Sequence, residues 1–291
     1  MANLKEIRNR IVSVNSTKQI TSAMKMVSAA KLRKAQDAII QMRPYANKMQ
    51  EIISNISAGL DSSEGVFSQQ RAENKVLLVG ITSNRGLCGG FNNNVIKSVN
   101  KLANETYKNS HVTVLPVGKK IKDALKKTEL QVSPILRPDT EKIWDDLTFE
   151  NTSAIANEIM QLFVDQKVDK VVLVYNQFKN AAVQLLQTEQ FLPVLPPQAE
   201  ETTASSVDYI YEPKKKTILE EMIPKSLKTQ LFKALLDSMA SEHGARMTAM
   251  HKATDNATTL INDLKLVYNK ARQAAITNEI LEIVAGAESL K

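Results

Sequence analysis

Apolar residues recur at steps of three and four along the N-terminal part of the chain, which is the spacing of one face of a helix. The apolar positions are Leu4, Ile7, Ile11, Val14, Ile20, Met24 and Val27. No Pro or Gly interrupts the stretch before Pro44, and a proline inside a helix can bend it without ending it. The pattern predicts one helix over residues 3–57, roughly 80 Å long, with a narrow seam of coiled-coil type.

The C-terminal part repeats this pattern. No proline follows Pro224, and the seam positions are Leu231, Leu235, Met239, Met247, Met250, Ala257, Leu260 or Ile261, Leu264, Val267 or Tyr268, and Ala271. We expect a second long helix over about 225–285, with Pro213 at a helix N-terminus and a break or kink at Pro224. Two such helices at opposite ends of a chain are expected to pair antiparallel.

The C-terminal helix is predicted to be the longer of the two, so its end would have no partner helix. That end is apolar: it contains Ile276, Ile280, Ile283 and Val284. An unpaired apolar helix end indicates a partner protein with an apolar socket.

Between the two helices, short continuous apolar runs alternate with helical segments. The predicted strands cover 75–83, 111–117, 170–175 and, at an edge, 181–192; the predicted helices begin near Phe91 and cover 118–125 and 151–164. This alternation is typical of a parallel-type, Rossmann-like α/β domain. The predicted fold is therefore α/β plus long helices, divided into a shaft helix over 1–57, a linker over 58–73, an α/β domain over 74–206 and a shaft helix over 207–291.

The net charge of +7 is concentrated at the N-terminal end. Residues 1–50 contain ten Lys or Arg and two acidic residues. An acidic protein, a nucleic acid or an anionic membrane surface would each explain this basic helix. Tyr45 is the only aromatic residue in the segment, which disfavours single-stranded nucleic acid. The longest wholly apolar runs are too short to cross a bilayer, so we expect a soluble or peripheral protein.

Catalytic and metal-binding patterns are weak. The turn 86–90 lies where a phosphate loop would, but it lacks the dinucleotide and P-loop spacings. A tight turn that needs Gly is favoured, with a phosphate site or a reactive Cys88 left open. His243 and His251 are eight residues apart, two helical turns rather than the one that chelation prefers. We therefore expect no metal, no cofactor and no catalytic site.

Four sequence blocks resemble γ subunits of F-type ATP synthases. They are KEIRNRI with TKQITSAMKMVSAAKLRKAQ near the start, RGLCGGFN at 85–92, DYIYEP at 208–213, and SEHGARMTAM with LVYNKARQAAITNEILEIVAGA toward the end. The blocks lie in the expected order and extend over the whole chain, whereas residues 120–206 match only in general pattern.

The resemblance implies a rotor. In that family the terminal helices form an asymmetric antiparallel coiled coil inside an α3β3 ring, called the catalytic ring below. The α/β domain forms a foot joined to the ε subunit and the membrane c-ring, and ATP chemistry belongs to β. The resemblance implies coupling of proton flow to ATP synthesis, no nucleic acid partner, membrane contact only through the c-ring, and a peripheral position on the cytoplasmic face of the bacterial inner membrane.

The same resemblance implies roles for individual residues. Those expected to face the acidic lever of β are Arg8, Met24, Lys25, Arg85 and Cys88. Arg246, Gln273 and Thr277 match positions that hydrogen-bond to loops of β, the apolar end fits a bearing sleeve, and Tyr209 and Tyr211 lie near the c-ring. The residues alone leave open a coiled-coil scaffold, or a nucleic-acid-binding protein with a basic helical arm, and less favourably a nucleotide-binding enzyme with helical arms.

Overall fold

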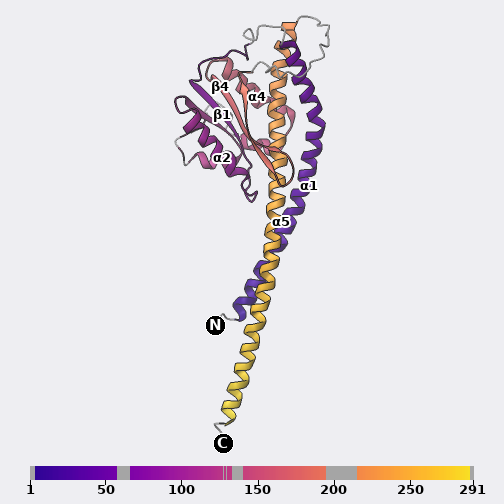
Figure 1. The fold of residues 1–291 in the computed structure, drawn as a ribbon, viewed down its shortest axis with the longest axis vertical. Helices are drawn as coiled ribbons and strands as arrows, with labels where there is room; N and C mark the ends of the chain where they lie inside the picture. Colours follow the sequence, from indigo (N-terminus) through magenta and orange to yellow (C-terminus); the bar gives the residue numbers. More distant parts are fainter. Residues whose placement is uncertain are drawn as a thin grey trace, which may run out of the picture. The chain divides into compact units, whose positions relative to one another are not determined.

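The computed structural model describes residues 4–57, 66–126, 128, 130–132, 140–194 and 215–288. The chain divides into two compact units, one formed by residues 1–29 with 246–291 and the other by residues 30–245. Two long helices, α1 (Leu4–Ser57) and α5 (Lys215–Glu288), contribute to both units (Figure 1). We call the first the two-helix unit and the second the sheet unit.

The two-helix unit is an antiparallel pair with the N-terminus of α1 and the C-terminus of α5 at the same end (Figure 1). A hydrogen bond of 2.9 Å between the hydroxyls of Thr21 and Thr254 fixes the register. Ile7 on α1 and Ile261 on α5 are buried in the seam. The expected pairing of two long helices at opposite ends of the chain is confirmed.

The seam of α1 differs from the predicted one beyond Val14. Ile20 and Val27 are 60% and 57% exposed, while Thr21 and Ser28 are buried. A strict seven-residue repeat from Ile7 through Val14 leads to Thr21 and then Ser28. The helix pair thus keeps its 3.5-residue periodicity even where the residues on the seam are polar.

Both internal prolines lie inside continuous helices. Helix α1 continues through Pro44, as expected, and α5 continues through Pro224. The prediction at Pro224 was a break or a kink, and the helix is not broken there. The neighbouring residues Ile223 and Leu227 are both buried in the core of the sheet unit, and this packing offsets the hydrogen bond that the proline removes. As a result α5 has 74 residues and α1 has 54.

The sheet unit contains one five-stranded sheet in the order β3-β2-β1-β4-β5. The strands are β1 (Lys75–Ile81), β2 (His111–Val117), β3 (Gln131–Val132), β4 (Lys170–Phe178) and β5 (Gln184–Leu192). All neighbours pair in parallel except β4 and β5, which form an antiparallel hairpin. The predicted α/β sheet is confirmed, with a mixed rather than wholly parallel pairing.

Helices cover both faces of the sheet, which explains why β1 and β4 are nearly continuous apolar runs. On one face lie α2 (Phe91–Lys101), its π-helical continuation (Leu102–Thr106) and α3 (Lys119–Leu125). On the other lie α4 (Phe149–Val164) and the first part of α5, with a 3₁₀ turn (Thr140–Trp144). Sequence patterns gave no signal for β3, which is two residues long.

Candidate interaction surfaces

The turn that follows β1 presents an exposed leucine. Leu87 and Gly89 have φ angles of 63° and 60°, the left-handed region that favours glycine. Leu87 is 64% exposed, and Arg85 is exposed beside it. A bulky side chain in a left-handed conformation costs about 1–2 kcal/mol, so its presence at an exposed turn suggests a role outside folding.

Side chains fill the space between the turn and α2. The Asn92 amide oxygen accepts from the Ser83 backbone N–H at 2.9 Å, and its nitrogen lies 3.1 Å from the Cys88 sulfur. Cys88 is 2% exposed. The Asn176 amide donates to the Phe91 carbonyl at 3.1 Å, which links β4 to the same place. A Rossmann-like sheet would bind a nucleotide at this position, but here the side chains of Asn92 and Asn176 are bonded to other protein groups. The buried Cys88 also lacks the solvent exposure of a reactive thiol.

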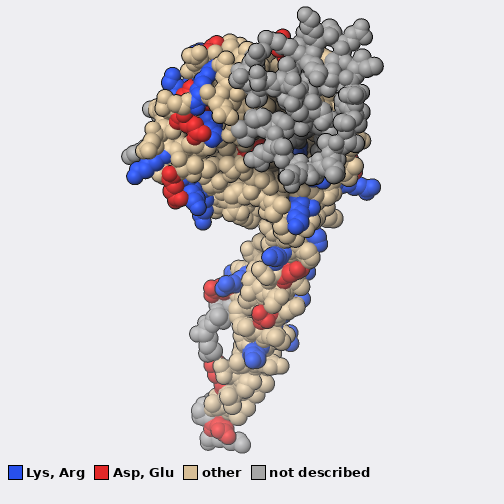
Figure 2. All heavy atoms as spheres, turned by 45° about the horizontal axis from the view of Figure 1, so that its top comes forward, with Lys and Arg blue, Asp and Glu red and all other residues tan. Residues whose placement is uncertain are grey.

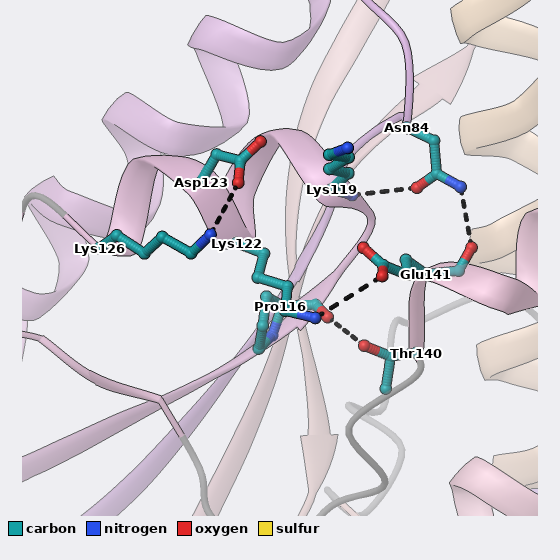
Figure 3. Close-up of polar contacts among 8 residues, drawn as sticks. All are labelled: Asn84, Pro116, Lys119, Lys122, Asp123, Lys126, Thr140 and Glu141. Atoms are coloured by element: carbon teal, nitrogen blue, oxygen red, sulfur yellow. Dashed lines mark hydrogen bonds and ion pairs between the residues drawn. The ribbon is translucent and has the colours of Figure 1, made fainter.

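The start of α3 is fastened to the end of β1. The backbone N–H groups of Lys119, Lys120 and Ile121 donate to the Asn84 side chain at 3.0 Å, the Ser83 carbonyl at 3.2 Å and the Thr82 hydroxyl at 3.1 Å. Figure 3 shows Lys119 beside Asn84. Since these donors at the helix start are already used, they are not available for an anion.

Lysines at this edge of the sheet differ in their counter-charges. Lys122 lies 3.7 Å from Glu141, and Lys126 lies 3.2 Å from Asp123 (Figure 3). In the described parts of the chain, no ion pair involves Lys119 or Lys120. Sequence patterns alone did not single out these two residues, although two lysines directly after a glycine at a strand end are a visible signal.

The residues predicted to contact β are distributed over both units. Arg85 and Cys88 lie in the sheet unit, and the other six lie in the two-helix unit. On α1, Arg8 is exposed whereas Met24 and Lys25 are half-buried. Arg246, on α5, is 7% exposed.

The end of α5 extends past the start of α1. The Thr21–Thr254 pair places Leu4 near residue 271 of the antiparallel partner. Residues 272–288, roughly 26 Å of helix at 1.5 Å per residue, therefore extend beyond the described part of α1. Gln273 and Thr277 are exposed there, and the Thr277 hydroxyl donates to the Gln273 carbonyl at 2.9 Å.

This unpaired end carries a stripe of exposed apolar side chains. Ile276, Ile280, Ile283 and Val284 are between 48% and 71% exposed. Their spacing places them on one side of the helix. Figure 2 shows the surface of the two-helix unit as mostly uncharged, with separated Lys, Arg, Asp and Glu side chains.

A buried carboxylate joins α1 and α5 inside the sheet unit. Asp237 is fully buried, and Arg43 of α1 lies 3.8 Å from it while also donating to the Phe178 carbonyl at 3.5 Å. Burial raises the pKa of Asp237, and the charges of Arg43 and Lys233 oppose that rise. The pair stabilises the contact between the two helices less than its charge suggests, because desolvation offsets the attraction.

A second polar group links the sheet to α5. The Tyr175 hydroxyl donates to Glu189 at 2.8 Å, and Gln230 donates to the other oxygen of the same carboxylate at 2.7 Å. Burial and the Glu189 charge raise the pKa of Tyr175, so it stays protonated and keeps donating. These bonds fix α5 against the antiparallel hairpin.

Two further features of the described part of the chain concern metal binding and membrane spanning. No three His, Cys, Asp or Glu side chains there lie close enough together to hold a metal ion. Among the described helices, none combines the length and the apolar character required to cross a lipid bilayer. Tyr209 and Tyr211 lie outside the described residues.

Comparison with known proteins gives matches along the whole chain. The family model described as ATP synthase matches residues 3–290. The "ATP synthase gamma chain" of Christiangramia forsetii is 60% identical and that of Flavobacterium johnsoniae 61% identical, each over 100% of this chain and 99% of the relative. A central-stalk and c-ring structure of the Tetrahymena thermophila mitochondrial ATP synthase matches with a TM-score of 0.57 and 28% identity, over 80% of this chain and 99% of the other.

Proposed function

Because the chain belongs to the ATP synthase gamma chain family, we propose that it is the central rotor shaft of a bacterial F-type ATP synthase. In this role it transmits rotation of a membrane ring, driven by proton flow, to the nucleotide sites of the catalytic ring. We propose that the shaft has no catalytic site of its own and that ATP chemistry takes place on the β subunits.

The observation that carries this proposal is the unpaired end of α5. A helix of this length with exposed Ile276, Ile280 and Ile283 is unfavourable in water, because its apolar area has no cover within the two-helix unit. A ring of subunits that closes around the end removes that area from water. An apolar lining also permits rotation, since apolar contacts are not directional.

The charge distribution of the two-helix unit supports a shaft with unlike sides. Residues 4–29 of α1 carry five Lys or Arg and one acidic residue, whereas residues 246–288 of α5 carry five of each sign. The α1 side is therefore positive and the α5 side nearly neutral. An acidic lever repeated on three β subunits would meet a different surface of the shaft at each rotational position. Arg8 and Lys25 are proposed to contact this lever.

Contacts at the turn after β1 follow the same reasoning. We propose that Arg85 contacts the acidic lever of β. Cys88 is proposed to contribute to the same contact from its buried position in the turn, where its sulfur lies beside Ser83 and Asn92. Half-buried Met24 is proposed to contact β through its exposed part. Arg246, Gln273 and Thr277 are proposed to hydrogen-bond with loops of β.

The remaining partners are the ε subunit and the c-ring, with Tyr209 and Tyr211 proposed near the c-ring. The complex would then hold the chain peripherally at the cytoplasmic face of the inner membrane, with no direct membrane contact of its own. A coiled-coil scaffold or nucleic-acid-binding arm would also use a basic helix, but family membership supports an acidic surface of β as the partner of that helix.

Co-purification tests the proposal most directly. A tag on the C-terminus of the β subunit is expected to recover this chain, at one copy for each catalytic ring, in a complex that hydrolyses ATP. The proposal fails if the chain purifies apart from the ring and instead binds DNA with a steep salt dependence. An untagged β preparation serves as the control for nonspecific recovery.

A further inference from the structure

A polar cluster inside the sheet unit has buried oxygens that its neighbours leave without hydrogen bonds. Asp237, Ser238 and Ser241 of α5 are fully buried. Among the described residues, no hydrogen bond reaches either carboxylate oxygen of Asp237 or the hydroxyls of the two serines. Such groups lose their water without replacing it and therefore destabilise a fold. Because costly local arrangements are found at functional positions, this cluster points to a role outside folding.

The end of the β4–β5 hairpin lies against the same side of α5. The would-be Cβ of Gly244 is 3.2 Å from the Ala181 Cα and 3.5 Å from the Phe178 ring. Gly244 follows Asp237 by seven residues, or two helical turns, so both residues lie on one side of the helix. The small glycine therefore lets the hairpin pack directly on the backbone of α5.

This end of the hairpin is itself held in one conformation. The Asn180 side-chain oxygen accepts from the backbone N–H groups of Ala182 at 3.0 Å and Val183 at 2.8 Å. The strands pair up to the last residues before this turn, Phe178 and Gln184. Since the turn is bonded internally and packed on α5, the Phe178 carbonyl has a fixed position relative to that helix.

Arg43 of α1 contacts both this carbonyl and the buried carboxylate. Its Nη2 donates to the Phe178 carbonyl at 3.5 Å and lies 3.8 Å from Oδ1 of Asp237. The Arg43 side chain is 47% exposed, whereas that of Asp237 is fully buried, so the arginine extends from the surface to the cluster. One side chain of α1 therefore joins that helix to β4 and to α5.

Arg43 adds a directional contact to a helix that is also held by apolar ones. Leu32, Ala35 and Ile39 of α1 are buried in the same unit. Apolar contacts are not directional, so they resist separation of α1 from its neighbours more than sliding or rotation. A hydrogen bond depends on angle as well as distance, so the contact of Arg43 opposes these movements too.

We propose that Arg43, with Asp237 and the Phe178 carbonyl, forms the joint that makes α1 turn together with the sheet unit. The inference rests on the proposed function, in which the acidic lever of β acts on α1 while the sheet unit is joined to the membrane ring. Force on α1 must then pass to the sheet unit, and Arg43 is a positioning residue for this transfer. Asp237 serves to hold Arg43 rather than to stabilise the fold.

The test measures the protons taken up per ATP hydrolysed, in lipid vesicles that contain the complete synthase with a variant of the full chain. Arg43→Gln, alone or with Asp237→Asn, is expected to lower this ratio about threefold, the scale of one partly exposed ion pair. The double variant has no buried charge without a partner, so its thermal midpoint should be at least that of the wild type. Arg33→Gln changes an exposed arginine of the same helix and unit and should leave both readings unchanged.

The double variant separates a joint from a structural ion pair. A normal midpoint with a low ratio supports the proposal, because with a structural role the ratio would recover together with the midpoint. If the double variant is less stable than the wild type, Asp237→Asn alone decides by the same two readings. The proposal is overturned if the stable variant couples like the wild type, or if Arg33→Gln lowers the ratio equally.

Failure of the proposed function has a different signature. In that case the wild-type chain itself would give no complex in which ATP hydrolysis drives proton uptake. The inference would fall with it, whereas a wild-type complex that couples normally leaves the joint as the only point under test.

Discussion

At the scale of single residues, the exposure of a side chain shows whether it can contact a partner. Cys88 and Leu87 are adjacent in sequence, yet one is 2% exposed and the other 64%. The resemblance pointed to Cys88 as a contact, whereas the fold buries its sulfur against Ser83 and Asn92. Neighbouring residues on a turn point in different directions, and only the backbone angles decide which side chain meets a partner.

Replacing Leu87 by Gly tests whether that leucine serves binding. We expect the free energy of unfolding to rise by about 1 kcal/mol, because glycine adopts the left-handed conformation without steric cost. ATP hydrolysis by the reconstituted complex should fall, since the apolar contact is lost. Leu87→Asn is the control: asparagine also tolerates this conformation, and it should be equally inactive. Full activity of both variants would show that the side chain has no role in binding.

Replacing Asp237 by Asn tests the buried carboxylate. Burial raises the pKa of Asp237, so the folded state binds more protons than the unfolded state just above the ordinary carboxyl range, and stability falls as the pH rises through that window. Asparagine removes this cost. We therefore expect the variant to have the higher thermal midpoint at pH 7–8 and the difference to shrink toward pH 4.

The prediction for Asp237 has a clear alternative. Arg43, Lys233 and Glu189 are the other charged groups that act on the carboxyl group. If the pair with Arg43 outweighed desolvation, Asp237→Asn would lower the midpoint at pH 7. Arg43→Gln provides the comparison, because it leaves the buried carboxylate without its nearest positive charge and should be destabilising at neutral pH.

At the scale of elements, α3 depends on one glycine. Gly118 has a φ of 112°. Alanine there would be strained in its backbone and would overlap the Thr82 carbonyl oxygen. We expect Gly118→Ala to lower the free energy of unfolding by about 2–4 kcal/mol, which a denaturant titration of the full chain would measure.

Gly90→Ala is the matched control for Gly118. Gly90 caps α2 with a φ of −79°, and the nearest atom to its would-be Cβ is 3.5 Å away, an ordinary contact. We expect a change within about 0.5 kcal/mol. A similar loss in both variants would mean that the backbone angle of Gly118 does not matter for the attachment of α3.

The long helices show which element properties are readable in a sequence. Residues 3–57 were predicted as a helix, and α1 covers Leu4–Ser57. Their seam was predicted less well, because Thr21 and Ser28 occupy seam positions that an apolar pattern cannot reveal. A break or kink at Pro224 was predicted from local geometry alone, whereas α5 is continuous there and the neighbouring Ile223 and Leu227 are buried.

At the scale of the whole molecule, the end of α5 should matter for assembly rather than for folding. Deleting residues 277–291 removes residues 277–288, all of which are exposed, together with the last three residues of the chain, so the thermal midpoint should change little. Assembly with the catalytic ring should weaken at least about tenfold, because several apolar side chains lose their burial in the complex. Recovery of the chain with tagged β is the measurement.

A variant that keeps the full length of α5 but loses its apolar stripe shows whether assembly depends on the apolar surface or on the length of the helix. Ile276→Gln, Ile280→Gln and Ile283→Gln in one chain keep the helix but remove its apolar stripe. We expect this variant to assemble as poorly as the truncated one. If it assembled normally while the truncation did not, helix length rather than apolar surface would be what the ring requires.

The sequence by itself determined the class of fold, the two long helices and the family. Helical periodicity, continuous apolar strands and four ordered sequence blocks are local or collinear signals, and each can be read without knowing where distant segments lie. The first β-strands were located for the same reason, since a strand buried on both faces is a continuous apolar run such as that of β1.

Only the tertiary structure decided the seam beyond Val14, the burial of Cys88 and the grouping of Lys119 and Lys120 with the turn after β1. Each depends on contacts between segments distant in sequence, as the bond between Lys119 and Asn84 shows. Which polar residues lose their water, and which charges find no counter-charge, follows from packing. A residue type shows what chemistry is available at a position, whereas the fold determines which groups that chemistry meets.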